Sequence, residues 1–169
     1  IKTMVQNGMY DIAAPELEEL IKNNPNHKSA ELAYFLLGES YFFLDKFDDA
    51  EKQYSALYDK FKESILFDKT LYRLGIININ AKRFDKSLKY FEEFQKKYPN
   101  SDLIYDVKFY LAVCYENASR FKDAIAAYKA AIDKGYLDKY YQQAAYSTGW
   151  CYYNLNDYEN AIKYFKEVK

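Results

Sequence analysis

The side chains that most often perform catalysis or bind metals are few in this sequence and are not grouped. The single histidine, His27, lies in a Pro-Asn-His-Lys connector without a His or Cys at ligand spacing, so a metal site is not expected. Cys114 and Cys151 stand 37 residues apart. As equivalent points on adjacent helices they would be about 8–10 Å apart, whereas a disulfide needs Cα atoms within about 7 Å. We interpret both as small buried residues.

Motifs that are typical of enzymes are also missing. The sequence contains no glycine-rich phosphate loop, no Gly-x-Ser-x-Gly turn and no paired-carboxylate motif. Carboxylate pairs such as Asp48-Asp49 lie on segments whose other face is apolar, which is typical of a solvated helix surface. We therefore predict no catalytic residue, no metal site, no cofactor and no enzymatic activity for this chain.

The composition narrows the class of protein further. The 169 residues include 24 basic and 25 acidic side chains, so the basic stripe of a nucleic-acid-binding protein is not expected. Half of the residues are hydrophobic and 29% are charged, which indicates a folded chain. No apolar run approaches the roughly 18–20 residues of a membrane-spanning helix, so we expect no membrane insertion of this segment. With only 5 Gly and 3 Pro, helices are favoured over strands.

A period of 37 residues runs through the whole sequence. Four columns of similar residues keep this interval: Gly38, Gly75, Ala112 and Gly149; Ala13, Ala50, Ser87, Ala124 and Ala161; Tyr10, Phe47, Phe84, Phe121 and Tyr158; and Leu17, Tyr54, Phe91, Tyr128 and Phe165. Several columns in one register indicate a repeat architecture, in which modules of the same kind stack on their neighbours.

Each module is predicted to be a pair of helices. Between Ser64 and Pro99, apolar residues at helical spacing predict one helix before Ala81 and a second that begins at Phe84 and is stopped by Pro99. The expected first helices lie near 29–44, 65–81, 102–118 and 139–155, the second helices near 47–61, 84–98, 121–134 and 158–169, and a partial module has helices at 1–7 and about 11–23. The expected caps are Ser64, Ser101 and Asp138 at N-termini and Gly135 at a C-terminus.

Two further local features lead to predictions. Pro15 suggests that the second helix of the partial module effectively starts near Ala14. A glycine inside a helix costs roughly 0.5–1 kcal/mol relative to alanine. We expect close approach of Ala50, on the paired helix, to offset this cost at Gly38, with the Tyr54 ring filling the space beside the contact.

The columns resemble the tetratricopeptide repeat (TPR) over essentially all 169 residues. The matching residues are Leu37, Gly38 and Tyr41 in a first helix, Ala50, Tyr54 and Leu57 in a second, and the closing Pro25 and Pro99. Departures are Tyr34, Leu71, Lys108 and Ala145 at the family's Trp position, Asn78 in place of Tyr, and Thr148 in place of Leu. The usual TPR period is about 34 residues. The longer form, with its Lys97-to-Ser101 stop-and-restart signal, is similar to TPR proteins of the bacterial cell envelope, such as the outer-membrane assembly lipoprotein and the Tol-Pal coordinator.

The resemblance implies an all-α fold, a right-handed α-α superhelical solenoid of about 4.5 helix hairpins. We expect one array over residues 1–169, divided into a partial repeat at 1–27 and repeats at 28–64, 65–101, 102–138 and 139–169. Neither end carries a polar cap, so we expect the intact protein to continue on at least one side, or to self-associate through these ends. The resemblance points to the periplasm or cell envelope, while free cysteines suit the cytoplasm equally well.

In TPR arrays the first helices line the concave face, so the family's inward positions predict a partner-binding groove. Carried over residue by residue, the candidate residues are Phe35, Glu39, Phe42, Phe43, Tyr72, Ile76, Asn80, Phe109, Val113, Asn117, Tyr146, Trp150, Tyr153 and Asn154. Trp150 is of a type favoured at binding hot spots, although it and the aromatic column at 35, 72, 109 and 146 could instead fill gaps between helices. The three Asn residues could bind a peptide backbone or cap helix C-termini.

Three hypotheses for the function follow. The first is a non-enzymatic scaffold that binds a protein or peptide segment in the aromatic groove, as part of a bacterial envelope assembly. The second is a glycan-binding TPR module of a polysaccharide-export system, since stacked aromatic rings with nearby Asn and Glu also suit sugars. The third is a purely structural, self-assembling spacer.

Overall fold

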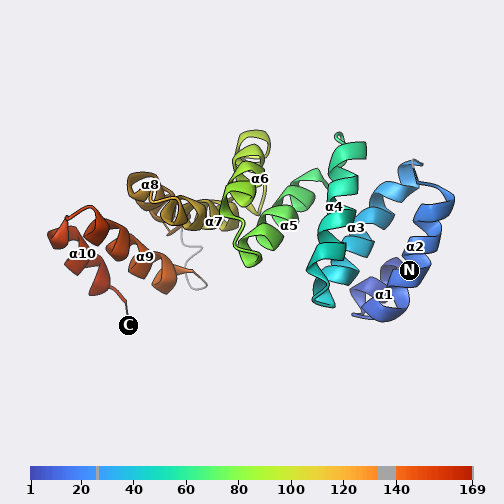
Figure 1. Cartoon of the computed structure of the whole chain (residues 1–169), viewed down its shortest axis with the longest axis horizontal. Coiled ribbons are helices and arrows are strands. Elements are labelled where there is room, and N and C mark those ends of the chain that lie inside the picture. The colour runs from blue at the N-terminus through green and yellow to red at the C-terminus, as the bar shows by residue number, and fades with distance from the viewer. Residues whose placement is uncertain (26, 133–139, 169) are drawn as a thin grey trace. The chain divides into compact units, whose positions relative to one another are not determined.

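The computed structural model describes residues 1–25, 27–132 and 140–168, and these residues form helices and no strand (Figure 1). The helices of this part of the chain are α1 (Lys2–Gln6), α2 (Tyr10–Asn23), α3 (Lys28–Phe43), α4 (Phe47–Lys60), α5 (Phe67–Asn80), α6 (Phe84–Lys97), α7 (Ile104–Asn117), α8 (Phe121–Ile132), α9 (Tyr141–Asn154) and α10 (Tyr158–Phe165). The all-α prediction is confirmed, and so is the alternation of first and second helices. The division into repeats at residues 27, 64, 101 and 138 stays a prediction.

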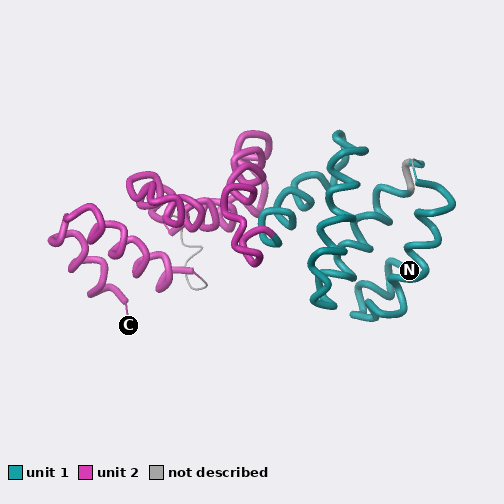
Figure 2. The backbone as a smooth tube through the Cα atoms, in the orientation of Figure 1, with its two compact units in different colours: residues 1–77 teal, residues 78–169 magenta. Residues whose placement is uncertain are grey.

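The chain forms two compact units, residues 1–77 and residues 78–169 (Figure 2). In unit 1, α3 packs against α2 on one side and α4 on the other. In unit 2, each of α7, α8 and α9 packs against the helix before it and the helix after it. This is the neighbour-only packing of stacked helix hairpins.

Two predicted helix bounds are wrong. Helix α2 starts at Tyr10, not near Ala14, because the Ala13 amide already bonds to the Met9 carbonyl at 3.0 Å. Pro15 lies inside the helix and removes only the bond that its own nitrogen would make. Helix α10 ends at Phe165 rather than at residue 169, because the bonds of its last turn tighten from i→i−4 to i→i−3, as from Glu167 to Tyr164 at 3.1 Å.

The predicted serine N-caps are also wrong. Helix α7 begins at Ile104, with Leu103 as its N-cap, and the Ser101 hydroxyl accepts the Leu103 amide at 3.4 Å within the preceding turn. Ser64 acts in the same way, since its hydroxyl accepts the Leu66 amide at 2.9 Å. These hydroxyls stabilise the turn that leads into the helix rather than the helix end itself. The caps expected at Asp138 and Gly135 lie outside the described residues.

The first helices end in a repeated left-handed turn that the sequence analysis did not anticipate. The residues with positive φ are Gly8, Asp45, Lys82, Ser119 and Asn156, at φ 76°, 58°, 56°, 56° and 62°, and they are 37 residues apart. At Lys82, the residue's own amide bonds to the Ile79 carbonyl at 2.8 Å, and the Arg83 amide bonds to the Asn78 carbonyl at 2.8 Å. This pair of bonds is the Schellman motif.

We expect Lys82→Gly to stabilise the protein by about 1 kcal/mol, because a side chain in the left-handed region carries a steric cost that glycine avoids. Urea unfolding followed by circular dichroism measures the change. Asn156→Gly is the matched control and should gain less, since Asn tolerates this conformation. A lower unfolding midpoint for Lys82→Gly would contradict the expectation.

The contact at Gly38 differs from the predicted pairing of small residues. A Cβ on Gly38 would lie 2.6 Å from Cε1 of Tyr54, so the aromatic ring lies directly on the glycine instead of beside a contact with Ala50. A Cβ on Gly149 would likewise lie 2.8 Å from the ring of Phe165, and there the backbone carbonyl of Ala161, the predicted partner on the paired helix, also lies 3.3 Å away. The missing side chain therefore makes room for the large residue of the second helix.

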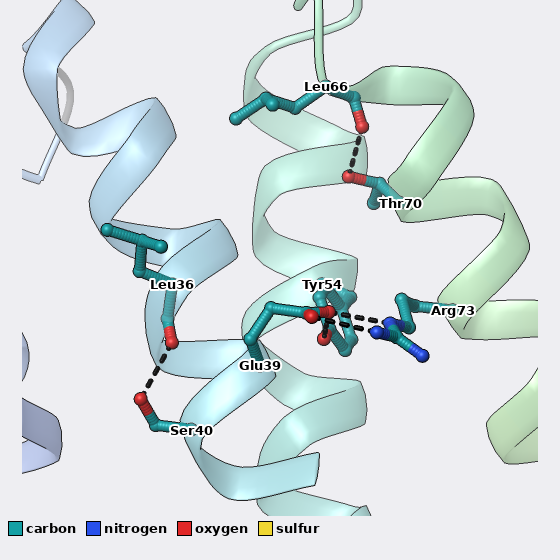
Figure 3. Close-up of polar contacts among 7 residues, drawn as sticks. All are labelled: Leu36, Glu39, Ser40, Tyr54, Leu66, Thr70 and Arg73. Carbon is teal, nitrogen blue, oxygen red and sulfur yellow. Dashed lines mark hydrogen bonds and ion pairs between the residues drawn. The ribbon is translucent and has the colours of Figure 1, made fainter. Parts of the chain in front are cut away.

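One buried hydroxyl in the core lacks a partner. Ser40 and Thr70 are fully buried, and each donates to the carbonyl four residues earlier, at 2.8 Å (Figure 3). Thr148 is also fully buried, but its hydroxyl makes no hydrogen bond within the described residues. An unsatisfied buried polar group of this kind costs about 1–3 kcal/mol.

We expect Thr148→Val to raise the free energy of unfolding by about 1 kcal/mol, because valine keeps the shape and removes the unpaired hydroxyl. Thr70→Val should instead lower the free energy of unfolding, because it removes a hydroxyl that donates a hydrogen bond to the Leu66 carbonyl. Equilibrium urea unfolding of both variants measures the difference. If both substitutions changed the free energy of unfolding in the same direction, this explanation would be wrong.

Candidate functional site

Three aromatic side chains of α9 form an exposed surface, which we call the α9 aromatic patch: Tyr146, Trp150 and Tyr153. Their exposed fractions are 54%, 45% and 49%. Spacings of four and three residues place them on one face of the helix. The Trp150 and Tyr153 rings stack with centroids 5.5 Å apart and planes 12° apart, and Tyr158 meets the Tyr153 ring edge-on at 5.5 Å. These three predicted site residues are therefore brought together at the surface.

Two other predicted site residues are buried, and for these the prediction of a partner contact is wrong. Phe109 is only 2% exposed, because the Tyr140 ring stacks on it at 4.3 Å and the Tyr128 ring packs edge-on at 5.7 Å. Ile76 is 9% exposed. Both are core residues rather than groove residues.

Two residues of the asparagine column bond to the backbone of their own helices. The Asn117 side-chain amide donates to the Val113 carbonyl at 2.9 Å, and that of Asn154 donates to the Trp150 carbonyl at 2.8 Å. Each bond joins the side chain to the carbonyl four residues earlier in its own first helix. The choice between the two predicted roles of these Asn residues stays a prediction. Asn80 is exposed at the same point of α5, and the Val113 side chain is half-buried.

In unit 1, Glu39 lies at the centre of a polar group that joins three helices, the Glu39 cluster: Glu39 of α3, Tyr54 of α4 and Arg73 of α5 (Figure 3). Arg73 Nε and Nη2 donate to Glu39 Oε1 and Oε2 at 2.6 and 2.8 Å. The hydroxyl of the fully buried Tyr54 donates to Oε1 at 2.5 Å. The side chains of Arg73 and Glu39 are only 23% and 14% exposed, so this bidentate pair is mostly shielded from water.

The Glu39 cluster also orders the aromatic side chains around it. The Arg73 guanidinium lies 4.6 Å from the Phe42 ring centroid and 5.6 Å from that of Phe43, within cation–π range. Phe43 is half exposed and stacks on Tyr10 at 4.9 Å. The remaining candidates of this unit, Phe35 and Tyr72, are half-buried, and Phe35 packs edge-on against Tyr54 at 5.8 Å.

Arg73 is the residue that sequence reasoning missed. Its counterparts 37 residues away are Leu36 and Tyr110, so no column marked the position as polar. The available signal was composition, since the chain has few arginines and an isolated one on an amphipathic helix is often paired.

Burial raises the pKa values of several titratable groups near these surfaces. Burial, together with the Glu39 carboxylate, raises the pKa of the Tyr54 phenol well above its ordinary value. Burial raises the pKa of the Cys114 thiol to about 11 and that of Cys151 to about 12, so both free cysteines stay protonated at neutral pH. Within the described ranges, no group of three or more His, Cys, Asp or Glu side chains could hold a metal ion. No helix in the described part of the chain is long and apolar enough to cross a membrane.

Comparison with known proteins identifies the repeat. The family model described as "Tetratricopeptide repeat" matches residues 4–65, 35–102, 72–136 and 117–169. A search of curated proteins gave no match. A crystal structure of MamA is 20% identical, with a TM-score of 0.80 over 97% of this chain and 89% of that one.

Two further solved structures are similar. One is MamA from Desulfovibrio magneticus RS-1, 17% identical, with a TM-score of 0.79 over 99% of this chain and 88% of that one. The other is YrrB, described as a TPR protein with an unusual peptide-binding site, 16% identical, with a TM-score of 0.82 over 98% of this chain and 79% of that one. At these identities the structures support the fold alone, while the family model covers nearly the whole sequence. The chain belongs to the tetratricopeptide repeat family.

Proposed function

We propose that this chain is a non-enzymatic scaffold that binds a peptide segment of a partner protein through the α9 aromatic patch, within a bacterial cell-envelope assembly. The observation that carries the proposal is the exposure of Tyr146, Trp150 and Tyr153 side by side on one helix face. Aromatic side chains bury a large area at low entropic cost, which is why they dominate binding hot spots. Membership of the TPR family and the peptide-binding site named for YrrB support a protein-interaction role.

The chemistry of the patch indicates what it would bind. Three large rings would take apolar or aromatic side chains of the partner. The exposed parts of the Trp150 and Tyr153 rings supply the contact area, and the exposed Asn154 next to them can orient a peptide backbone. In unit 1, the exposed Phe43 ring, held beside Arg73, offers a second apolar contact of the same kind.

The only tryptophan of the chain, Trp150, is a built-in reporter of this binding. Peptides selected from a phage-displayed random library on the immobilised chain should shift its emission to the blue. Trp150→Ala and Tyr146→Ala should each weaken binding of a labelled peptide about tenfold or more, as hot-spot truncations do. Ile65→Ala is the matched control, because Ile65 is 90% exposed and lies outside the patch. Unchanged affinity in both patch variants would reject the proposal.

Glycan binding is the second candidate. The parallel stack of Trp150 and Tyr153 favours it, since flat ring faces also bind sugars. Oligosaccharides titrated in the same fluorescence assay separate the two candidates. A saturable emission shift with sugar and none with the selected peptides would favour the glycan.

A further inference from the structure

Three exposed apolar side chains lie where the first turn of α2 meets the end of α3, and we call them the α2 edge: Met9, Ile12 and Phe43. They are 44%, 52% and 50% exposed. Met9 is the N-cap of α2, and Ile12 follows one helical turn later. The Phe43 ring stacks on Tyr10 with centroids 4.9 Å apart. The edge lies within unit 1, where α2 packs against α3.

The equivalent positions of the other repeats are polar. At intervals of 37 residues, Met9 is followed by Lys46, Arg83, Arg120 and Asp157, Ile12 by Asp49, Lys86, Asp123 and Asn160, and Phe43 by Asn80, Asn117 and Asn154. The repeat therefore folds with polar side chains at all three positions. Apolar residues at the α2 edge serve a purpose other than packing of the repeat.

The exposure of these positions does not depend on a neighbouring repeat. Helix α7 packs against α6 and α8, and α8 packs against α7 and α9. Even so, Asn117 of α7 and both Arg120 and Asp123 at the start of α8 are exposed. The α2 edge thus lies outside the surfaces through which the repeats stack.

The surroundings of the α2 edge are acidic. The Phe43 ring lies beside Arg73, but the guanidinium of Arg73 is paired with Glu39. Lys46 is an exposed cation of the turn that follows α3. The exposed carboxylates on α2, on the same turn and on the first turn of α4 are Asp11, Glu16, Glu18, Asp45, Asp48 and Asp49. A partner that covers the edge therefore meets an excess of negative charge.

A cavity of about 380 Å³ lies next to the α2 edge, between α2 and the turn that follows α3. The Tyr41 hydroxyl donates a hydrogen bond to the Glu18 carboxylate there. Its lining combines apolar groups with carboxylates and one ammonium group: Ala14, Pro15, Tyr41, Leu44, Asp11, Glu18 and Lys46. An apolar lining with carboxylates suits a lysine or arginine side chain, which has an apolar stem and a cationic head.

We propose that the α2 edge binds an amphipathic α-helix of a partner protein, whose apolar side is flanked by lysine or arginine. The apolar side covers Met9, Ile12 and Phe43, and one of the basic side chains enters the cavity. A helix fits because its backbone bonds are internal, whereas an extended segment would need a strand to pair with, and the described residues form none. The carboxylates also repel anionic lipid headgroups, which makes a protein the partner rather than a membrane.

A synthetic helical peptide of about 18 residues, with leucine on one face and lysine on the other, is the probe. Its twin carries glutamate in place of each lysine. Labelled with fluorescein and titrated with the full chain, the lysine peptide should give saturable binding by anisotropy, at least about tenfold tighter than its twin. Asp11→Asn should weaken binding of the lysine peptide and reduce its dependence on salt.

Phe43→Asn and Met9→Gln should each weaken binding of the lysine peptide at least about tenfold. Phe43→Asn places the residue of the other repeats at this position, so the fold should tolerate it, and circular dichroism checks this. Ile65→Asn is the matched control and should leave binding unchanged, because Ile65 is 90% exposed in the same unit and lies outside the edge. Trp150→Ala should also leave it unchanged, since this proposal does not rest on the α9 aromatic patch.

Three results would overturn the proposal: equal affinity for the two peptides, unchanged binding by both Phe43→Asn and Met9→Gln, or no binding at about 1 mM lysine peptide. Binding to phosphatidylglycerol vesicles that Phe43→Asn abolishes would overturn it in favour of a membrane. Concentration-dependent self-association that Phe43→Asn abolishes, without peptide binding, would overturn it in favour of a second copy of the chain.

Discussion

Glu39→Ala is expected to lower the free energy of unfolding by about 3 kcal/mol. The substitution removes the acceptor of three hydrogen bonds, two from Arg73 and one from Tyr54. It leaves a mostly shielded guanidinium without its counter-charge and a fully buried phenol without an acceptor. Because the three residues come from α3, α4 and α5, the loss affects the packing of one repeat on the next. Equilibrium urea unfolding measures it.

Glu116→Ala is the matched control for this prediction. Glu116 accepts one bond, from the Tyr128 hydroxyl at 2.6 Å, so its removal should cost about 1 kcal/mol. Glu39→Gln should fall between the two, because the amide oxygen still accepts the Tyr54 hydroxyl while the charge is lost. Similar losses for Glu39→Ala and Glu116→Ala would show that the contact with Arg73 contributes little.

Gly38→Ala is expected to destabilise the protein by about 2–3 kcal/mol, although alanine is the better helix former. The added Cβ would lie 2.6 Å from the Tyr54 ring, which is fully buried and held at its hydroxyl by Glu39. The ring cannot move aside without breaking that bond. Thermal and urea unfolding of the variant measure the cost.

The sign of the Gly38 effect depends on its surroundings, and the third repeat provides the control. Ala112 is the natural residue at the equivalent position and is fully buried, so Ala112→Gly should destabilise by about 1 kcal/mol through helix propensity and lost contacts. A double-mutant cycle of Gly38→Ala with Tyr54→Leu isolates the clash. Additive effects in that cycle would rule out the ring as the cause of the loss.

The fold could be predicted because its signals recur. Four columns in one register fixed the helix pairs, and most bounds agree within about two residues, as at α4 and α6. The repeat pattern did not predict the left-handed turns or the residues that occupy them. Lys82 and Ser119 lack the glycine signal there, because the flanking backbone bonds impose the conformation instead.

The candidate site was harder to predict, because equivalent positions differ in what covers them. Phe109 and Tyr146 occupy the same place in consecutive repeats, yet one is buried and the other is exposed. The rings of Tyr140, a residue outside the column, and Tyr128 both pack on Phe109. Tertiary neighbours of this kind are invisible to a pattern of spacing alone. Arg73 was missed for the same reason, since its partner Glu39 lies 34 residues away on another helix.

The left-handed turns have a consequence for how this array can vary. Asp45, Lys82, Ser119 and Asn156 are all exposed and carry an anion, a cation, a hydroxyl and an amide at the same backbone geometry. Because main-chain bonds hold the geometry, the chemical character of each hairpin tip is free to change without repacking the interior. Each hairpin thus has a tip at which the surface charge can change, while the backbone geometry beneath it stays the same.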